Sequence, residues 1–292
     1  MMLRGVEICV EDGLLGTPYR PIARIGEGTS AEVFEALGPG GARRAVKVLR
    51  AIHTGMREAV MRLEDEGRTL SALSHPNLVH VFDTGTTTDG RPYFTMPRLD
   101  GETLRDRLLR EGPMQPARAC SLFAGLLDGL DAAHAAGIVH RDVKPANIFI
   151  VRESKGERCV LLDFGIAKLE GEGREASVEG EVVGTPRYIA PEQILGGLVD
   201  ARTDLYSAGI VLFEMIAGRS PYDGKDSAEM MHAHVTARPR RLRDLAPVAP
   251  DLDYVVGRAL SKDPARRWPS ARAFAVVLER ALAFEHVEEA SR

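Results

Sequence analysis

The sequence is poor in several features that would place it in a special class of proteins. It has only three cysteines, Cys9, Cys120 and Cys159, which are far apart and form no C-x-x-C pair. Neither a disulfide framework nor a zinc site is therefore indicated, and a reducing compartment, the cytoplasm, is expected. No basic and apolar leader opens the chain.

Long apolar runs and an excess of one charge are also missing. The most membrane-like stretch, 205–217, contains Ser207 and Glu214 and is shorter than the roughly 20 residues that a spanning helix needs, so no membrane segment is expected. The net charge of -4 gives no signal for nucleic acid as a partner. A local basic cluster is interpreted mainly as a solvated loop, with partner docking as the alternative: Arg238, Arg240, Arg241 and Arg243.

The composition is that of an ordinary globular protein, and one short turn contains several charged and polar residues. The 292 residues are 44% hydrophobic and 27% charged, and this length suggests one large domain or two lobes. Residues 140–147 read His-Arg-Asp-Val-Lys-Pro-Ala-Asn. Asp142 could accept a proton from an attacking hydroxyl, Lys144 could neutralise a moving phosphoryl group, and Asn147 offers the oxygen ligand that Mg2+ prefers. The turn resembles the catalytic loop of protein kinases, H-R-D-x-x-x-x-N.

A glycine-rich turn near the start of the chain has the composition of a phosphate-binding turn. Residues 22–25 and 32–36 are predicted strands, joined through Gly26-Glu27-Gly28-Thr29-Ser30-Ala31. Glycines let the backbone approach a phosphate closely. A dinucleotide-binding turn or a plain hairpin can look similar, but a dinucleotide-binding turn leads into a helix. This one leads into a second strand, which favours the kinase interpretation.

A lysine and a glutamate are predicted to pair behind this turn. Residues 45–49 form a predicted strand in which Lys47 shares an apolar face with Ala45 and Leu49, so its ammonium group needs an anion. Residues 56–73 have helical spacing that puts Glu66 on the inward face. We predict a Lys47–Glu66 pair, as the resemblance to kinases also implies. The alternative for Glu66 is a surface charge.

Two more strands, 78–83 and 91–96, meet at an Asp89-Gly90 turn and complete a five-stranded antiparallel sheet with one helix. Pro97-Arg98-Leu99 then resembles the kinase hinge, after Met96 as gatekeeper. By that resemblance the Pro97 carbonyl and the Leu99 N–H contact adenine. The implied ATP-binding set is Ile25, Gly26, Gly28, Val33, Ala45, Lys47, Glu66, Met96, Pro97, Leu99 and Phe149.

The rest of the chain is predicted to be mainly helical, with helices at 104–109, 116–136, 204–217, 227–235, 252–261 and 270–285. A hairpin of strands 148–151 and 160–162 delivers Asp163-Phe164-Gly165 close to the catalytic turn. Asp163 matches the kinase Mg2+ aspartate, so Asn147 and Asp163 are the expected metal ligands. His134 is taken as an ordinary helix histidine, because no second ligand stands at metal spacing.

Residues 184–192, Gly-Thr-Pro-Arg-Tyr-Ile-Ala-Pro-Glu, resemble the end of the activation segment in bacterial serine/threonine kinases. The resemblance implies that Thr185 hydrogen-bonds Asp142 and Lys144, and that Glu192 is buried against Arg267. Asp204 matches the aspartate that supports the catalytic loop from beneath.

The expected fold is therefore α+β and bilobal, with a small antiparallel sheet lobe and a larger helical lobe. The expected boundaries are an arm at 1–18, the sheet lobe at 19–96, a hinge at 97–100, the helical lobe at 101–285 and a tail at 286–292.

The resemblance implies a kinase that moves the γ-phosphoryl group of ATP to protein Ser or Thr hydroxyls, with Asp142 and Lys144 as catalytic residues. The implied metal ion is Mg2+, with Mn2+ as the alternative. A pseudokinase scaffold and a small-molecule phosphotransferase of the same fold are the alternatives. Intact Lys47 and Asp163 argue against the first, and the 185–192 run argues against the second.

Arg141 places the chain among kinases whose catalytic-loop arginine can bind an activation-loop phosphate. Ser177 is the only hydroxyl between residues 168 and 184, so we predict that it is autophosphorylated. Two alternatives stay open: the surrounding glutamates partly neutralise Arg141, or they only keep the loop solvated.

Overall fold

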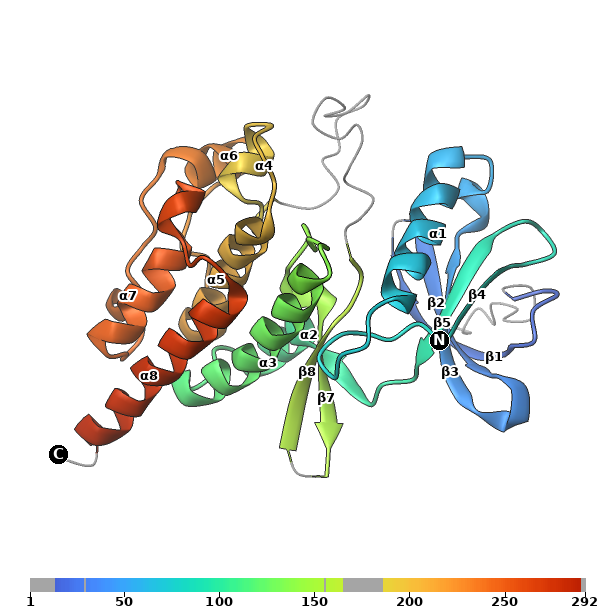
Figure 1. Ribbon diagram of the computed structural model, residues 1–292, viewed down its shortest axis with the longest axis horizontal. Helices are drawn as coiled ribbons and strands as arrows, with labels where there is room; N and C mark the ends of the chain where they lie inside the picture. The colour runs from blue at the N-terminus through green and yellow to red at the C-terminus, as the bar shows by residue number, and fades with distance from the viewer. Residues whose placement is uncertain (1–13, 29, 155, 165–185, 290–292) are drawn as a thin grey trace, which may run out of the picture. The chain divides into compact units, whose positions relative to one another are not determined.

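Figure 1 draws the computed structural model, which describes residues 14–28, 30–154, 156–164 and 186–289, with side chains as far as residue 282. The chain divides into two compact units. The first comprises residues up to 74 together with 79–100, and the second comprises 75–78 together with the residues from 101 onward. Each unit has its own sheet and its own buried core.

The first unit is an antiparallel sheet of five strands with one long helix. The strands are β1 (Arg20–Glu27), β2 (Ala31–Leu37), β3 (Arg43–Leu49), β4 (Asp83–Thr86) and β5 (Pro92–Pro97), in the order β1-β2-β3-β5-β4. Helix α1 (Arg57–Ser71) packs on β3, β4 and β5. Short 3-10 turns η2 (Pro39–Gly41) and η3 (Ala51–His53) flank β3. The predicted sheet and helix are confirmed.

One predicted strand of this sheet was wrong in its bounds. Residues 78–82 do not form it, and β4 begins at Asp83. The backbone of Asn77 and Leu78 is used elsewhere: the Asn77 carbonyl accepts from Leu161 N at 2.8 Å, and Leu78 forms a parallel bridge with Leu161. Because these residues belong to the second unit and their backbone groups bond within it, strand pairing with β5 starts only after them.

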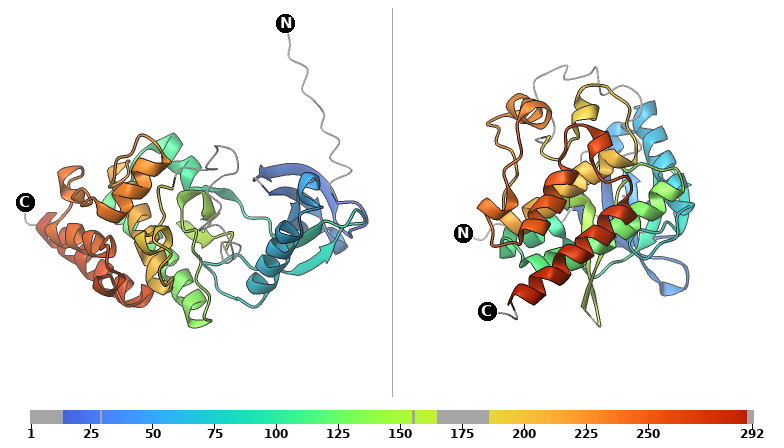
Figure 2. Two further views of the ribbon diagram at one scale, coloured as in Figure 1. Left: turned by 90° about the horizontal axis from the view of Figure 1, so that it is seen from above. Right: turned by 60° about the vertical axis from the view of Figure 1, so that its left-hand side comes forward.

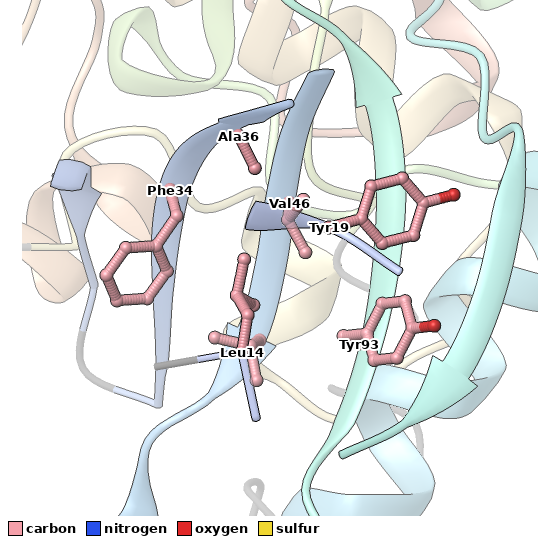
Figure 3. Packing of buried hydrophobic residues seen from close by; sticks show 7 residues of the cluster. Leu14, Tyr19, Phe34, Ala36, Val46 and Tyr93 are labelled. Carbon is pink, nitrogen blue, oxygen red and sulfur yellow. The ribbon is translucent and has the colours of Figure 1, made fainter. Parts of the chain in front are cut away.

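The sheet face opposite Lys47 is covered by a compact apolar cluster, shown in Figure 3. Its members are Leu14, Tyr19, Phe34, Ala36, Val46, Val48 and Tyr93. Val46 and Val48 alternate with Lys47 along β3, so they point to the other face of the sheet. Leu14 is only 3% exposed and packs there. The hydroxyl group of Tyr19 donates to Asp83 Oδ2 at 3.1 Å, which joins this segment to the edge strand β4.

The second unit is mainly helical, with a three-stranded sheet of β6 (Gly101–Thr103), β7 (Ile148–Glu153) and β8 (Gly156–Leu161). Its helices are α2 (Leu104–Glu111), α3 (Pro116–Ala135), α4 (Pro191–Ile194), α5 (Ala201–Ala217), α6 (Ser227–Thr236), α7 (Pro250–Ala259) and α8 (Ala271–Glu289), with 3-10 turns η4 (Pro145–Asn147), η6 (Leu242–Asp244) and η7 (Pro264–Arg266). Helix α8 lies alongside α3 (Figure 2). No helix in the described part of the chain is long and apolar enough to cross a membrane.

Helix α5 lies at the centre of this unit because its sequence is apolar nearly all round. Its N-terminus is closed by a capping box, in which Asp200 and Thr203 satisfy each other's backbone N–H groups. It ends at Gly218, whose φ of +70° is the left-handed conformation that favours glycine. These signals fix where the helix begins and ends, and they therefore place Asp204 on its first turn.

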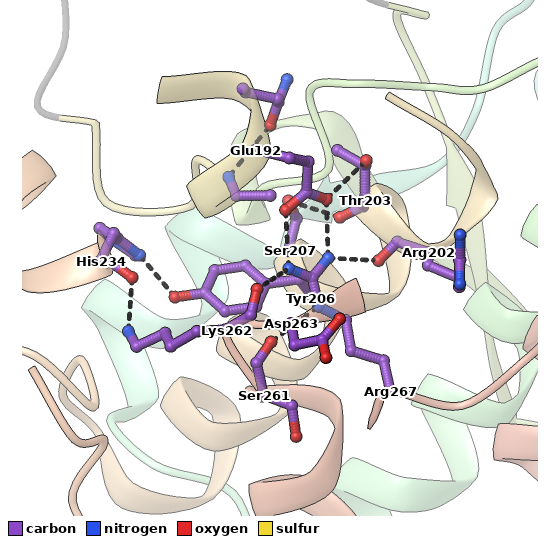
Figure 4. A network of polar contacts seen from close by, with 12 residues as sticks. Glu192, Arg202, Thr203, Tyr206, Ser207, His234, Ser261, Lys262, Asp263 and Arg267 are labelled. Atoms are coloured by element: carbon purple, nitrogen blue, oxygen red, sulfur yellow. Dashed lines mark hydrogen bonds and ion pairs between the residues drawn. The ribbon is translucent and has the colours of Figure 1, made fainter. Parts of the chain in front are cut away.

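A buried ion pair joins α4 to the segment that precedes α8 (Figure 4). The Arg267 guanidinium donates to both Glu192 oxygens at 2.7 Å, and Arg267 is 1% exposed. It also donates to the carbonyls of Arg202 and Ser261 and lies over the Tyr206 ring at 4.7 Å. All the main donors of this guanidinium are thus satisfied, and the pairing predicted for Glu192 is confirmed.

Arg267→Ala is expected to destabilise the second unit by about 3 to 5 kcal/mol, because it leaves the Glu192 carboxylate buried and unpaired. The matched control is Arg266→Ala, since the neighbouring Arg266 side chain is 82% exposed. Urea unfolding followed by the fluorescence of Trp268, the single tryptophan, measures both. Equal unfolding midpoints for the two variants would show that the ion pair contributes nothing.

A buried histidine of α6 makes this unit sensitive to acid. His234 is 0% exposed, and its Nδ1 bonds to the Tyr206 hydroxyl at 2.9 Å. Burial, and then the nearby Lys262 ammonium, lowers the pKa of His234 from its ordinary 6.5 to about 4. The unfolded chain therefore binds the proton more tightly, so this contribution to stability is complete above pH 6.5 and is lost as the pH falls towards 4.

Between pH 7.5 and pH 4.5 the wild type is expected to lose on the order of 2 kcal/mol of stability through His234. His234→Gln removes the titrating group, so its loss over the same range should be smaller by that amount. His232→Gln, an exposed position on the same helix, is the control. Trp268 fluorescence in urea at both pH values provides the measurement, and identical pH dependence in all three proteins would refute the assignment.

Candidate active site

The turn at 140–147 is held in one conformation by its own polar groups. Lys144 Nζ donates to Asp142 Oδ2 at 2.6 Å. The Asn147 side-chain nitrogen donates to the same oxygen at 3.0 Å and to the Asp142 carbonyl at 2.9 Å. Because the amide nitrogen is directed to Asp142, the amide oxygen of Asn147 is the atom it presents as a ligand. The three predicted residues of this turn therefore lie together.

A buried carboxylate on α5 supports this turn. Asp204 is 0% exposed, and its two oxygens accept from His140 N at 2.8 Å and from Arg141 N at 2.7 Å. Arg141 has φ +67°, a conformation that non-glycine residues rarely adopt. Gln193 Nε2 donates to the Arg141 carbonyl at 3.1 Å. The supporting role expected for Asp204 is confirmed, since its carboxylate holds a strained turn in place.

His134 also belongs to this support, which the sequence did not reveal. Its Nε2 lies 2.8 Å from Asp204 Oδ2, so α3 contributes a third partner to the carboxylate. His134 comes from the last turn of α3, close to the start of α5 only in the folded unit. Its helical periodicity is that of an ordinary inward-facing residue, and no local signal distinguishes it.

A second set of bonds ties the turn to the residues after β8. His140 Nε2 donates to the Leu162 carbonyl at 2.9 Å, and Leu162 N donates to the Asn147 carbonyl at 2.8 Å. Burial lowers the pKa of His140, so the ring is neutral, with Nδ1 left to accept from Asp142 N at 3.2 Å. The Phe164 ring packs on His140 at 4.6 Å. Asp163, with φ +39°, is therefore delivered directly beside the chain of Asn147.

In the first unit, Lys47 and Glu66 form the predicted buried pair. Lys47 Nζ donates to the two Glu66 oxygens at 2.8 and 3.0 Å, and each residue is 9% exposed. The pairing confirms the inward face assigned to Glu66. The Lys47 ammonium also lies 5.4 Å from the centre of the Phe94 ring, so it is screened from water on that side.

The strand register brings the predicted adenine-side residues of this unit together. Val33 is opposite both Gly26 and Lys47, and Ala45 is opposite Met96. Paired residues point to the same side of a sheet, so these side chains line the face that carries Lys47. Ile25 is 42% exposed. Pro97, the last residue of β5, and Leu99 are half-buried. Phe149 is half-buried on β7 of the second unit.

The glycine turn is tight but not crowded. Gly28 N donates to the Ala31 carbonyl at 2.8 Å. A Cβ added at Gly26 or Gly28 would come no closer than 3.4 Å to any other atom, an ordinary contact distance. The folded chain itself therefore does not require glycine at these two positions, which leaves close approach of a ligand as a reason for them.

A pocket of about 690 Å3 opens beside Asp142 and Lys144 within the second unit. Arg105 and Leu108 of α2 line it on one side and residues 186–189 on another. Tyr188 donates to Glu214 at its base, and burial followed by this carboxylate raises the pKa of Tyr188. Three predicted participants, Gly165, Ser177 and Thr185, lie outside the described residues.

Comparison with known proteins identifies the family. The protein kinase domain model matches residues 19–276. The chain belongs to the protein kinase domain family. It is 40% identical to the serine/threonine-protein kinase Pkn1 of Myxococcus xanthus over 97% of this chain and 41% of that protein. It is 41% identical to the serine/threonine-protein kinase PknB of Mycolicibacterium smegmatis over 78% of this chain and 37% of that protein. This kinase chain thus spans about two fifths of the length of these relatives.

A solved structure agrees with this assignment. The PknI kinase domain of Mycobacterium tuberculosis matches 93% of this chain and 98% of its own, with a TM-score of 0.73 and 27% identity. The predicted fold, a small antiparallel sheet unit with one helix and a larger helical unit, is confirmed. Protein kinase domains use ATP and a divalent metal ion. In the described part of this kinase domain, no group of three or more His, Cys, Asp or Glu side chains is placed so that it could hold a metal ion.

His134→Ala is expected to lower kcat by up to about tenfold, because a hydrogen bond to a charged group contributes about 1.5 kcal/mol and here it orients Asp204 under the catalytic turn. The KM for ATP should change little, since His134 contacts Asp204 within the second unit, whereas Lys47 and Glu66 lie in the first. His232→Ala, exposed on α6, is the control. Steady-state kinetics decide the matter: an unchanged kcat, or a loss matched by a rise in KM, would contradict the positioning role.

Proposed function

We propose that this kinase domain transfers the γ-phosphoryl group of ATP to Ser or Thr hydroxyl groups of proteins. The observation that carries the proposal is the presence of both halves of the machinery, the Lys47–Glu66 pair at 2.8 Å and the Asp142–Lys144–Asn147 turn. A scaffold protein has no need of two strained or buried charge arrangements that cost stability. The serine/threonine kinases among its relatives support the acceptor type.

The two units would supply different parts of the reaction. In the first unit Lys47, oriented by Glu66, would bind the α- and β-phosphates, and the turn with Gly26 and Gly28 would cover them. The adenine would lie against Ile25, Val33, Ala45 and Met96, with the Pro97 carbonyl, the Leu99 N–H and Phe149 completing its site. Mg2+ is the ion we propose, because an amide oxygen and a carboxylate, from Asn147 and Asp163, are hard ligands that leave room for phosphate oxygens.

In the second unit Asp142 would accept the proton of the attacking hydroxyl as its oxygen forms the new bond to phosphorus. The bond to the β–γ bridging oxygen breaks, and ADP leaves with that electron pair. Lys144, 2.6 Å from Asp142, would neutralise charge on the transferred group. The pocket beside Asp142, lined by Arg105 and Tyr188, would hold the acceptor peptide. Residues 186–189 line this pocket and belong to the run that a small-molecule phosphotransferase of this fold is expected to lack, which favours a protein substrate.

We also propose that the domain works in the cytoplasm. Among the described residues, the side chains of Cys120 and Cys159 are both buried. Burial raises the pKa of the Cys159 thiol to about 12, so it stays protonated and unreactive. Such thiols are typical of a reducing compartment that also supplies ATP and Mg2+.

Asp142→Asn is expected to lower kcat for phosphate transfer from labelled ATP to a generic protein substrate by about 10^2- to 10^4-fold, since it removes the proton acceptor. Binding of a fluorescent ATP analogue should persist, because Lys47 and Glu66 are unchanged. Asp251→Asn, exposed on α7, is the control. If the wild type transfers no phosphate but binds the nucleotide, the pseudokinase alternative holds. If it phosphorylates only small molecules, the peptide acceptor is wrong.

A further inference from the structure

A second pocket lies in the helical unit, and it shares no lining residue with the pocket beside Asp142. Its volume is about 550 Å3, which is within the range of ligand sites. It is enclosed by α7, by the loop of residues 239–242 that follows α6, and by Phe213 of α5. The loop belongs to the arginine cluster that the sequence left open between a solvated surface and a docking site.

The floor of this pocket is apolar and contains a gap. Phe213, Leu242, Val256 and Leu260 line it and are each about 1% exposed or less. Gly257 of α7 lies at the exposed edge of the pocket, where an added Cβ would point into open space and meet no atom within 4 Å. Glycine inside a helix costs about 1 kcal/mol relative to alanine. Nothing in the described packing requires this glycine, and a side chain from a ligand would fill the space that it leaves.

The rim is strongly basic. Four arginines and one aspartate line the pocket, although the whole chain has a net charge of -4. The aspartate does not balance them, because Asp253 accepts from Leu242 N at 2.7 Å and pairs with Arg243 at 3.5 Å. Arg240 is committed to Asp223, to which it donates at 2.8 Å.

The other three arginines of the lining have no strong ion pair with a described residue, so their guanidinium groups can bind a ligand. The Arg258 guanidinium lies over the Trp268 ring at 4.2 Å, and its buried Nε has no hydrogen-bond partner within the described structure. Arg241 makes no ion pair with any described residue. Arg266 reaches Asp263 only at 3.8 Å, with both side chains more than half exposed, so this pair is weak. Stacking on Trp268 fixes the orientation of one guanidinium, and planar guanidinium groups match carboxylates.

We propose that this pocket docks an acidic segment of a partner protein, which inserts one large apolar side chain over Gly257 while its carboxylates meet Arg241, Arg258 and Arg266. The arginines of the rim favour a segment with negative charge, and the apolar residues of the floor favour an apolar side chain as its anchor. A nucleic acid or an anionic membrane offers extended charge but no single apolar group for the floor. Because the pocket is separate from the catalytic turn, docking does not depend on phosphoryl transfer.

The test is binding of a fluorescein-labelled peptide with one leucine among glutamates, measured by anisotropy with the whole chain and no ATP. Gly257→Leu fills the gap and is expected to weaken binding at least about tenfold, which corresponds to 1.4 kcal/mol. The double variant Arg241→Gln, Arg266→Gln should weaken it similarly and reduce the salt dependence. The charge-matched control is Arg272→Gln, Arg280→Gln, at two exposed positions on α8.

Leucine is a good helix former, so Gly257→Leu should not lower the melting temperature, and a thermal melt confirms that the variant is folded. The proposal is overturned if both variants bind like the control, or if a peptide with lysines in place of glutamates binds equally well. It also fails if phosphatidylserine vesicles or single-stranded RNA, and not the peptide, bind in an Arg241-dependent manner. Phosphorylation of a short substrate without an acidic segment should be the same in wild type and Gly257→Leu.

Discussion

The helical unit depends on one buried carboxylate, that of Asp204. It accepts hydrogen bonds from two consecutive backbone N–H groups and lies beside a histidine, with no exposure to water. A charge in such a place is stable only when its lone pairs are filled by donors. The two backbone donors are oriented correctly only if Arg141 takes its left-handed conformation. The turn at residues 140–147 is thus bent by the requirement to satisfy a charge beneath it.

Helix α5 carries this charge on its first turn. Its cap fixes the position of the first turn, and its apolar surface is buried on all sides. The same helix supplies Thr203, whose hydroxyl donates to Glu192 at 2.7 Å. Glu192 is in turn clamped by Arg267. The turn at residues 140–147 and the segment that follows residue 186 are therefore both held by helix α5. This shared support fixes the position of Asp142 relative to the pocket beside it.

Much of this arrangement was predictable from the sequence, for identifiable reasons. Lys47 and Glu66 follow from strand and helix periodicity, since a lysine on an apolar face requires an acid at a similar depth. The catalytic turn follows from residue spacing within eight positions. What failed depends on contacts between distant segments. The strand expected at 78–83 reads as apolar, but the Asn77 and Leu78 backbone bonds to β8. His134 looks like any inward-facing helix residue until α3 is placed against α5.

The glycines illustrate the same limit more sharply. Gly218 can be assigned from sequence to a helix end, and its φ of +70° confirms that the backbone needs it. Gly26 and Gly28 belong to a glycine-rich turn and Gly257 lies inside helix α7, and the space around each shows that the folded chain does not need glycine there. A residue that lowers helix or strand stability without serving its own backbone indicates that something outside the chain uses the space. For Gly26 and Gly28 the ligand that we propose is a phosphate group of ATP. For Gly257 the surrounding guanidinium groups and apolar floor indicate an acidic protein segment with an apolar anchor.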